Sequence, residues 1–221
     1  RLVVPTPSGC SVVWVAAADY DADGVDEIAS ADGTGALFLL NWTGADWEEV
    51  RTNLPQGLGL TQLLMAYIDD DDTPDLFALT KANEIYAILN REKAWETILI
   101  DDEFDYNAIA AGDINGDGLM DLIASQPAGI MIFTADAPAS WTREEAVTPT
   151  SGQKFTNVGL DRLDNDEWLD FVAIEDYKAL RLFYSRDGAP PGGWAGFTPS
   201  GWITTFNPDC AIQVVDNVGL D

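Results

Sequence analysis

The chain contains no histidine, only two cysteines (Cys10 and Cys210) and few basic residues. Without histidine it lacks the side chain most often used near neutral pH as a general base and as a metal ligand. Two cysteines cannot build the multi-bridge framework of a small disulfide-rich domain. No apolar run approaches the roughly 18 residues of a membrane-spanning helix, so we expect no membrane insertion.

The shortage of lysine and arginine leaves a large excess of negative charge. The chain has 11 Lys and Arg against 38 Asp and Glu, which gives a formal net charge of −27. Such a field repels nucleic acid and anionic membrane surfaces and attracts cations. The 221 residues are 47% hydrophobic, enough for a sizeable core. The composition therefore argues against a disordered chain and against a nucleic-acid partner.

One acidic stretch runs from Asp113 to Asp121 with the sequence DINGDGLMD. Counted from Asp113, oxygen-bearing side chains fall at loop positions one, three, five and nine, and Gly118 falls at position six. Calcium takes roughly six to eight oxygen ligands, and alternating acidic residues in a tight turn can direct carboxylates at one ion. The same spacing recurs from Asp19 to Glu27, with glutamate at position nine.

Neither stretch is an EF-hand. An EF-hand loop ends in a bidentate glutamate at position twelve, where this chain has Ser30 and Ala124. The flanking residues are short apolar or alternating runs, which predict strands rather than amphipathic helices. Each acidic loop is therefore expected to join two strands. The alternative for any acidic cluster of this kind is an ordinary solvated turn rich in Asp and Asn.

The chain repeats itself four times. Residues equivalent to loop position nine are spaced 48, 46 and 49 residues apart, and each begins a similar apolar run: Glu27, Asp75, Asp121 and Asp170. Three tryptophans, Trp47, Trp95 and Trp141, each follow position nine by 20 residues, and Trp194 follows it by 24. We expect these tryptophans to pack between neighbouring sheets.

Four short strands per period of about 40–50 residues predict the blade of a β-propeller. The expected fold is all-β, with four-stranded antiparallel blades at roughly 11–54, 59–102, 105–148 and 154–200, and partial blades at 1–10 and 210–221. Four blades and two parts leave sheet edges open. We therefore expect this chain to be a segment of a longer protein or of a larger assembly.

The stretch from Ala111 to Leu122 and the loop from Asp19 to Glu27 resemble the FG-GAP and VCBS repeat family, the calcium-binding blades of the integrin alpha-chain propeller and of many secreted bacterial proteins. Ser125, Gln126 and Pro127 stand where that family has Gly-Ala-Pro, so the bacterial-type repeats are the closer match. The resemblance implies a ring of about seven blades with Ca²⁺ on one rim. It also implies an extracellular, periplasmic or cell-surface setting.

Carried over position by position, the resemblance implies two calcium sites. In the first loop the ligands would be the side chains of Asp19, Asp21, Asp23 and Glu27 and the carbonyl of Val25. In the third loop they would be the side chains of Asp113, Asn115, Asp117 and Asp121 and the carbonyl of Leu119.

The second and fourth loops depart from the pattern and are weaker metal candidates. Their ligands would be Asp69, Asp71 and Asp75 in the second loop, and Asp164, Asp166 and Asp170 in the fourth. Tyr67 and Arg162 occupy position one. We hypothesise that Arg162 pairs with a carboxylate of its own loop in place of a metal; alternatively, Asp161 shifts into position one. About two calcium sites are expected, and up to four.

The leading functional prediction is a non-catalytic, calcium-stabilised binding or scaffolding propeller that recognises a protein or a glycan. No histidine and no Gly-x-Ser-x-Gly motif is present, which argues against an enzyme. Fold alone does not decide function. The alternatives are the propeller of a calcium-dependent extracellular enzyme, such as a polysaccharide lyase or hydrolase, and a structural spacer in a larger surface assembly.

Overall fold

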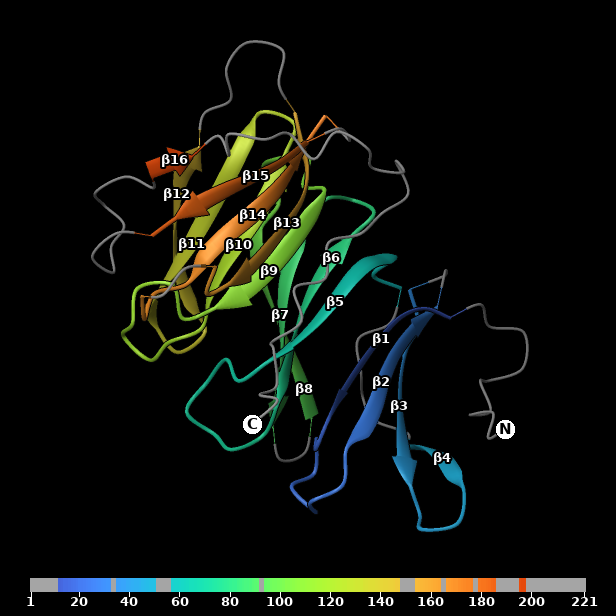
Figure 1. Ribbon diagram of the computed structural model, residues 1–221. Helices are drawn as coiled ribbons and strands as arrows, with labels where there is room; N and C mark the ends of the chain where they lie inside the picture. The colour runs from blue at the N-terminus through green and yellow to red at the C-terminus, as the bar shows by residue number, and fades with distance from the viewer. Residues whose placement is uncertain are drawn as a thin grey trace. The chain divides into compact units, whose positions relative to one another are not determined.

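The computed structural model describes residues 12–32, 35–50, 57–91, 94–147, 154–163, 166–176, 179–185 and 195–197 (Figure 1). Within these ranges the chain forms strands β1 to β16 and no helix. The same ranges accordingly hold no helical segment that could cross a membrane. The partial blades expected at 1–10 and 210–221 lie outside the described residues, as does Trp194.

The strands form four antiparallel sheets of four strands, and in each sheet neighbours in sequence are neighbours in space. The first sheet contains β1 (Val12–Ala18), β2 (Glu27–Asp32), β3 (Leu37–Trp42) and β4 (Trp47–Val50). The second contains β5 (Leu60–Ala66), β6 (Asp75–Thr80), β7 (Ile85–Arg91) and β8 (Ala94–Asp101).

The third sheet contains β9 (Ala108–Gly112), β10 (Asp121–Gln126), β11 (Gly129–Ala137) and β12 (Ser140–Val147). The fourth contains β13 (Phe155–Asp161), β14 (Asp170–Glu175), β15 (Ala179–Tyr184) and β16 (Ala195–Phe197). The predicted all-β class with four-stranded antiparallel blades is confirmed. A meander of this kind is the unit from which propellers are built.

The second strand of each sheet is the most buried. Every residue of β6, β10 and β14 is buried. Because successive side chains of a strand point to opposite faces, complete burial means that both faces of these strands are covered. This explains their near-continuous apolar sequences, which alternation alone would not predict.

The chain divides into two compact units, residues 1–103 and 104–221. In the first unit β1 and β2 pack against β5, around a core that includes Ala31, Leu76, Ala78 and Ile88. In the second unit β9 and β10 pack against β13. The core there is more aromatic, and the ring of Phe171 stacks on that of Phe183 with centroids 4.3 Å apart.

The acidic loops all connect the first strand of a sheet to its second strand. Position nine is the first residue of the second strand and pairs with the last residue of the first strand: Glu27 with Ala18, Asp75 with Ala66, Asp121 with Gly112 and Asp170 with Asp161. The prediction that each loop joins two strands is therefore confirmed.

Candidate metal loops

A buried carboxylate at loop position nine closes each of the last three loops. In the second loop, Asp75 Oδ2 accepts a hydrogen bond from the N–H of Ile68 (2.9 Å), and its Oδ1 accepts one from the N–H of Asn90 (2.7 Å). Asp121 makes the same pair of contacts with Ile114 and Ala135, and Asp170 makes them with Leu163 and Ser185. The acidic residue at this position thus ties the loop to the end of the third strand.

In the first loop, Glu27 makes only one of these two backbone contacts. Its Oε2 accepts a hydrogen bond from the N–H of Tyr20 (2.8 Å), but its Oε1 is buried and has no hydrogen-bond partner among the described residues. The residue is only 1% exposed. An unpartnered buried carboxylate oxygen is costly, and a bound cation would remove that cost.

The first loop gathers two further carboxylates near that of Glu27. One oxygen each of Asp19, Asp21 and Glu27 lies within 4.8 Å of the others. Burial raises the pKa of Glu27 above its usual value, and the negative charges of Asp21, Asp23 and Asp19 raise it further. The three side chains therefore form a cluster of negative charge, which a hard cation would neutralise.

Backbone hydrogen bonds hold the ligands of the first loop in place. Asp19 accepts from the N–H groups of Asp23 (3.0 Å) and Gly24 (2.8 Å), and Asp23 accepts from that of Val25 (2.8 Å). Gly24 has a φ of +90°, a conformation that glycine adopts without strain. The turn is thus fixed by the chain itself before any ion binds.

The third loop has the same construction. Asp113 accepts from the N–H groups of Gly116 (2.7 Å), Asp117 (3.1 Å) and Gly118 (2.9 Å). Asp117 accepts from the N–H of Leu119 (2.8 Å) and from the side-chain amide of Asn115 (2.9 Å). Asp113, Asn115 and Asp117 are therefore linked by hydrogen bonds within one turn. Unlike Glu27, however, Asp121 uses both oxygens to hold the backbone.

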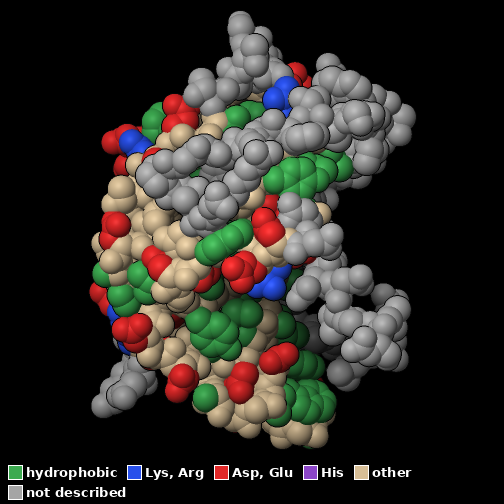
Figure 2. Space-filling model, turned by 60° about the vertical axis from the view of Figure 1, so that its left-hand side comes forward, with side chains coloured by type: hydrophobic (Ala, Val, Ile, Leu, Met, Phe, Trp, Pro, Cys, Tyr) green, Lys and Arg blue, Asp and Glu red, His purple; other side chains and the backbone are tan. Residues whose placement is uncertain are grey.

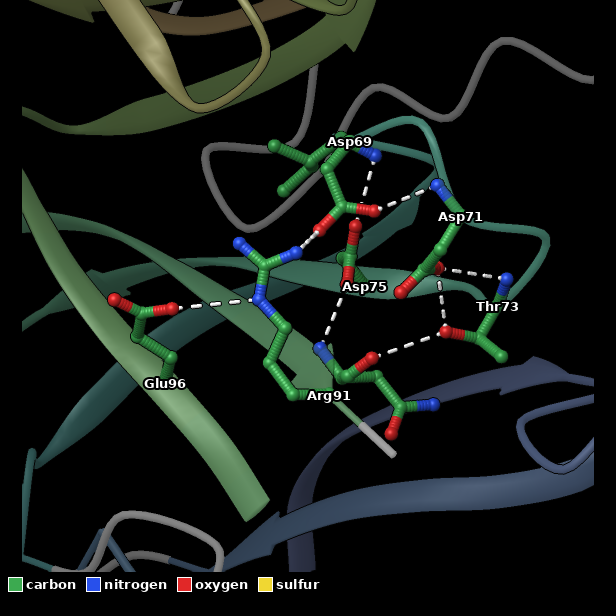
Figure 3. Close-up of polar contacts among 8 residues, drawn as sticks. Asp69, Asp71, Thr73, Asp75, Arg91 and Glu96 are labelled. Carbon is green, nitrogen blue, oxygen red and sulfur yellow. Dashed lines mark hydrogen bonds and ion pairs between the residues drawn. The ribbon is translucent and has the colours of Figure 1, made fainter. Parts of the chain in front are cut away.

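In the second loop the guanidinium group of Arg91 lies beside the carboxylate of Asp69 (Figure 3). Arg91, at the end of β7, forms an ion pair with Asp69, whose side chain is 5% exposed, and a weaker one with Glu96 (3.3 Å). Asp71 accepts from both the N–H (2.9 Å) and the hydroxyl (2.6 Å) of Thr73. The sequence analysis missed Arg91, because only the strand register brings it to a loop 22 residues away.

The carboxylates of the second loop differ in their pKa values. Burial acts to raise the pKa of Asp71, but hydrogen bonds from Thr73 and the charge of Arg91 lower it below its usual value. Burial raises the pKa of Asp75 to about 6, against the effect of its two backbone hydrogen bonds. In this loop the positive charge of Arg91 therefore already balances the negative charge of Asp69.

The fourth loop is described only in part, since Asp164 lies outside the described residues. Asp166 accepts from the N–H of Trp168 (2.9 Å). Arg162 lines a cavity of about 480 Å³ together with Asp113, Glu167 and Trp168. The hypothesis that Arg162 replaces a metal in its own loop stays a prediction.

Each sheet of this chain is a four-stranded meander with an acidic loop between its first and second strands. This arrangement is that of a propeller-blade repeat. Residues 67–124 match the family described as FG-GAP-like repeat. The match runs from the second acidic loop through the third loop and into β10. The resemblance stated from the sequence is confirmed for this part of the chain. A search of curated proteins gave no match.

Proposed function

We propose that this chain is a calcium-stabilised, non-catalytic recognition or scaffolding propeller segment that acts outside the cell, in the periplasm or at the cell surface. Two observations carry the calcium part: Oε1 of Glu27 is buried and unpartnered among the described residues, and the carboxylate of Glu27 clusters with those of Asp19 and Asp21. The FG-GAP-like match supports the recognition or scaffolding role.

In the first loop, calcium would be held by Asp19, Asp21, Asp23, the carbonyl of Val25 and Glu27. In the third loop, Asp113, Asn115, Asp117, the carbonyl of Leu119 and Asp121 would hold it. The ion would supply positive charge and no reaction chemistry, and its binding free energy would add to folding stability. We further propose that the second loop holds no metal, because Arg91 already pairs with Asp69.

The binding partner is proposed to be a protein or a glycan. Figure 2 shows one face of the molecule, on which Asp and Glu side chains are more frequent than Lys and Arg. A surface of this charge disfavours polyanions. It is compatible with neutral glycans and with proteins that present basic groups.

The calcium proposal is tested by thermal unfolding in excess Ca²⁺ and in chelator. The wild type should melt at a higher temperature in Ca²⁺, whereas Glu27→Gln should lose most of the increase that comes from the first loop. Glutamine keeps an oxygen for the N–H of Tyr20 but removes the charge. Asp70→Asn, an exposed change in the second loop, serves as the control and should respond to Ca²⁺ like the wild type. Equal responses from Glu27→Gln and the control would refute the first-loop site.

A further inference from the structure

The first unit contains a cavity of about 420 Å³ between its two sheets. Tyr20, Glu27 and Leu39 form a buried floor, whereas Asp21, Asp71 and Arg91 are exposed at its rim. A water molecule occupies about 30 Å³ of the liquid, so the volume corresponds to roughly a dozen waters or to one sugar ring with its substituents. The size lies within the usual range of small-molecule sites.

The two sheets are tied together at this cavity. The side-chain amide of Asn90, on β7, donates a hydrogen bond to the carbonyl of Tyr20 in the first loop (2.8 Å). The ring of Trp95, on β8, lies 5.9 Å from that of Tyr20. The cavity wall is therefore built from residues far apart in sequence and is fixed on both sides, which favours a preformed site.

Three residues of the cavity lining each carry a buried polar atom that has no hydrogen-bond partner within the described part of the chain: the Tyr20 hydroxyl, Asn41 Oδ1 and Glu27 Oε1. Tyr20 is 3% exposed. Such groups cost free energy unless something else pairs with them. The calcium ion proposed for the first loop would take Glu27 Oε1, but it leaves the other two atoms without a partner.

The remaining two atoms define the chemistry of a ligand. The Tyr20 hydroxyl can donate a hydrogen bond and can also accept one. Asn41 Oδ1 can only accept. A hydroxyl group of a ligand can accept from Tyr20 and donate to Asn41 Oδ1. The carboxylate of Asp71 at the rim disfavours an anion.

The apolar part of the cavity lining also fits a ligand that carries hydroxyl groups. Leu39 and the rings of Tyr20 and Trp95 give the cavity an apolar surface beside its polar atoms. The face of a pyranose ring carries C–H groups that pack on aromatic and aliphatic side chains, while its edge carries hydroxyl groups. From these contacts we infer that the cavity binds one neutral sugar unit. The inference rests on the proposed recognition function and specifies glycan rather than protein as the ligand class.

The test uses the whole chain in saturating Ca²⁺ with glucose, galactose, mannose and N-acetylglucosamine as probes. Binding is followed by ligand-observed NMR and by tryptophan fluorescence, because Trp95 lines the cavity. Thermal melts are unsuitable here, since sugars also stabilise proteins by exclusion from their surface. We expect at least one sugar to bind, and methylammonium and phosphate not to compete with it.

Two matched variants each remove one tyrosine hydroxyl. Tyr20→Phe should weaken sugar binding by about tenfold without loss of thermal stability, because the removed hydroxyl has no hydrogen-bond partner among the described residues. Tyr86→Phe, the control, removes a hydroxyl that bonds to Glu84 outside the cavity lining and should bind sugar like the wild type. Asn41→Leu should weaken binding as Tyr20→Phe does.

The outcomes separate this inference from the calcium proposal. Failure of all four sugars to bind, with Ca²⁺ bound as proposed, would overturn the sugar site alone and leave a water-filled cavity. Displacement of the sugar by methylammonium, or equal sugar binding by Tyr20→Phe and Tyr86→Phe, would also overturn it. Sugar binding without Ca²⁺ binding would support the cavity and refute the metal sites. Unchanged Ca²⁺ affinity in Tyr20→Phe would confirm that the variant leaves the first loop intact.

Discussion

The indole ring of Trp168, in the fourth acidic loop, lies directly against Gly116, in the third. A Cβ added at Gly116 would lie 2.5 Å from Cζ3 of Trp168. Gly116 also has a φ of +76°, which favours glycine. The third loop therefore depends on glycine here for two reasons, its backbone conformation and its contact with the next sheet of the same unit.

We expect Gly116→Ala to destabilise the protein by about 2–3 kcal/mol, because a strained backbone and an overpacked contact add together. Gly118→Ala is the matched control. Gly118 has a similar φ of +86°, but no atom of the described residues lies within 4 Å of its added Cβ. It should cost about 1 kcal/mol. Urea unfolding measures both, and equal losses would contradict the proposed contact with Trp168.

A second prediction concerns Arg91. Arg91→Gln leaves the nearly buried Asp69 without its ion-pair partner, and we expect the free energy of unfolding in chelator to fall by about 1–2 kcal/mol. Added Ca²⁺ should recover part of this loss by binding the freed carboxylates of the second loop. The measurement is urea unfolding with and without Ca²⁺.

The control for Arg91 is Glu96→Gln, which removes the more exposed of its two partners. Pairs this exposed contribute little, so the loss should stay below about 0.5 kcal/mol. If the Arg91 and Glu96 variants behave alike, Arg91 does not substitute for a cation in the second loop.

A third prediction concerns pH. Asp75 is fully buried, and burial raises its pKa to about 6, whereas in the unfolded chain it titrates near about 3.9. The folded state therefore holds this proton more tightly. The resulting stabilisation is complete below about pH 4 and is lost as pH rises through about 6.

Asp75→Asn isolates that contribution, because all other carboxylates titrate in both proteins. In chelator, the free energy of unfolding of the wild type minus that of the variant should decrease as the pH rises from 4 to 6. The decrease should be at most about 1.4 kcal/mol per pH unit. Urea unfolding at each pH gives the difference. A difference that is constant or that rises with pH would contradict the raised pKa of Asp75.

The repeat, the strands and the loops could be predicted from the sequence, because position nine always begins a strand and the pattern recurs at nearly constant spacing. The three equally spaced tryptophans do not share one contact. Trp95 packs on Tyr20 of the neighbouring sheet, as predicted. Trp47 instead pairs with Trp42 in its own sheet, and Trp141 donates to the carbonyl of Met120. Equal spacing predicts where the tryptophans lie along the chain, but their contacts depend on the residues that pack around each of them.

The partners of the loop side chains could not be predicted. Spacing alone identifies Asp75 and Glu27 as equivalent, yet Asp75 binds two backbone N–H groups and Glu27 binds one. The glutamate side chain is longer by one methylene group, and its second oxygen has no hydrogen-bond partner among the described residues. Arg91 and the cavity beside Tyr20 likewise arise from strand register and sheet packing, which the local sequence does not encode.

The most direct test of the calcium proposal is a calorimetric Ca²⁺ titration of the metal-free protein at neutral pH. We predict about two ions per chain, one lost in Glu27→Gln and the other in Asp113→Asn. No binding at all would reduce the first and third loops to ordinary turns. Four ions would show that the second and fourth loops also bind, and would contradict the role given to Arg91.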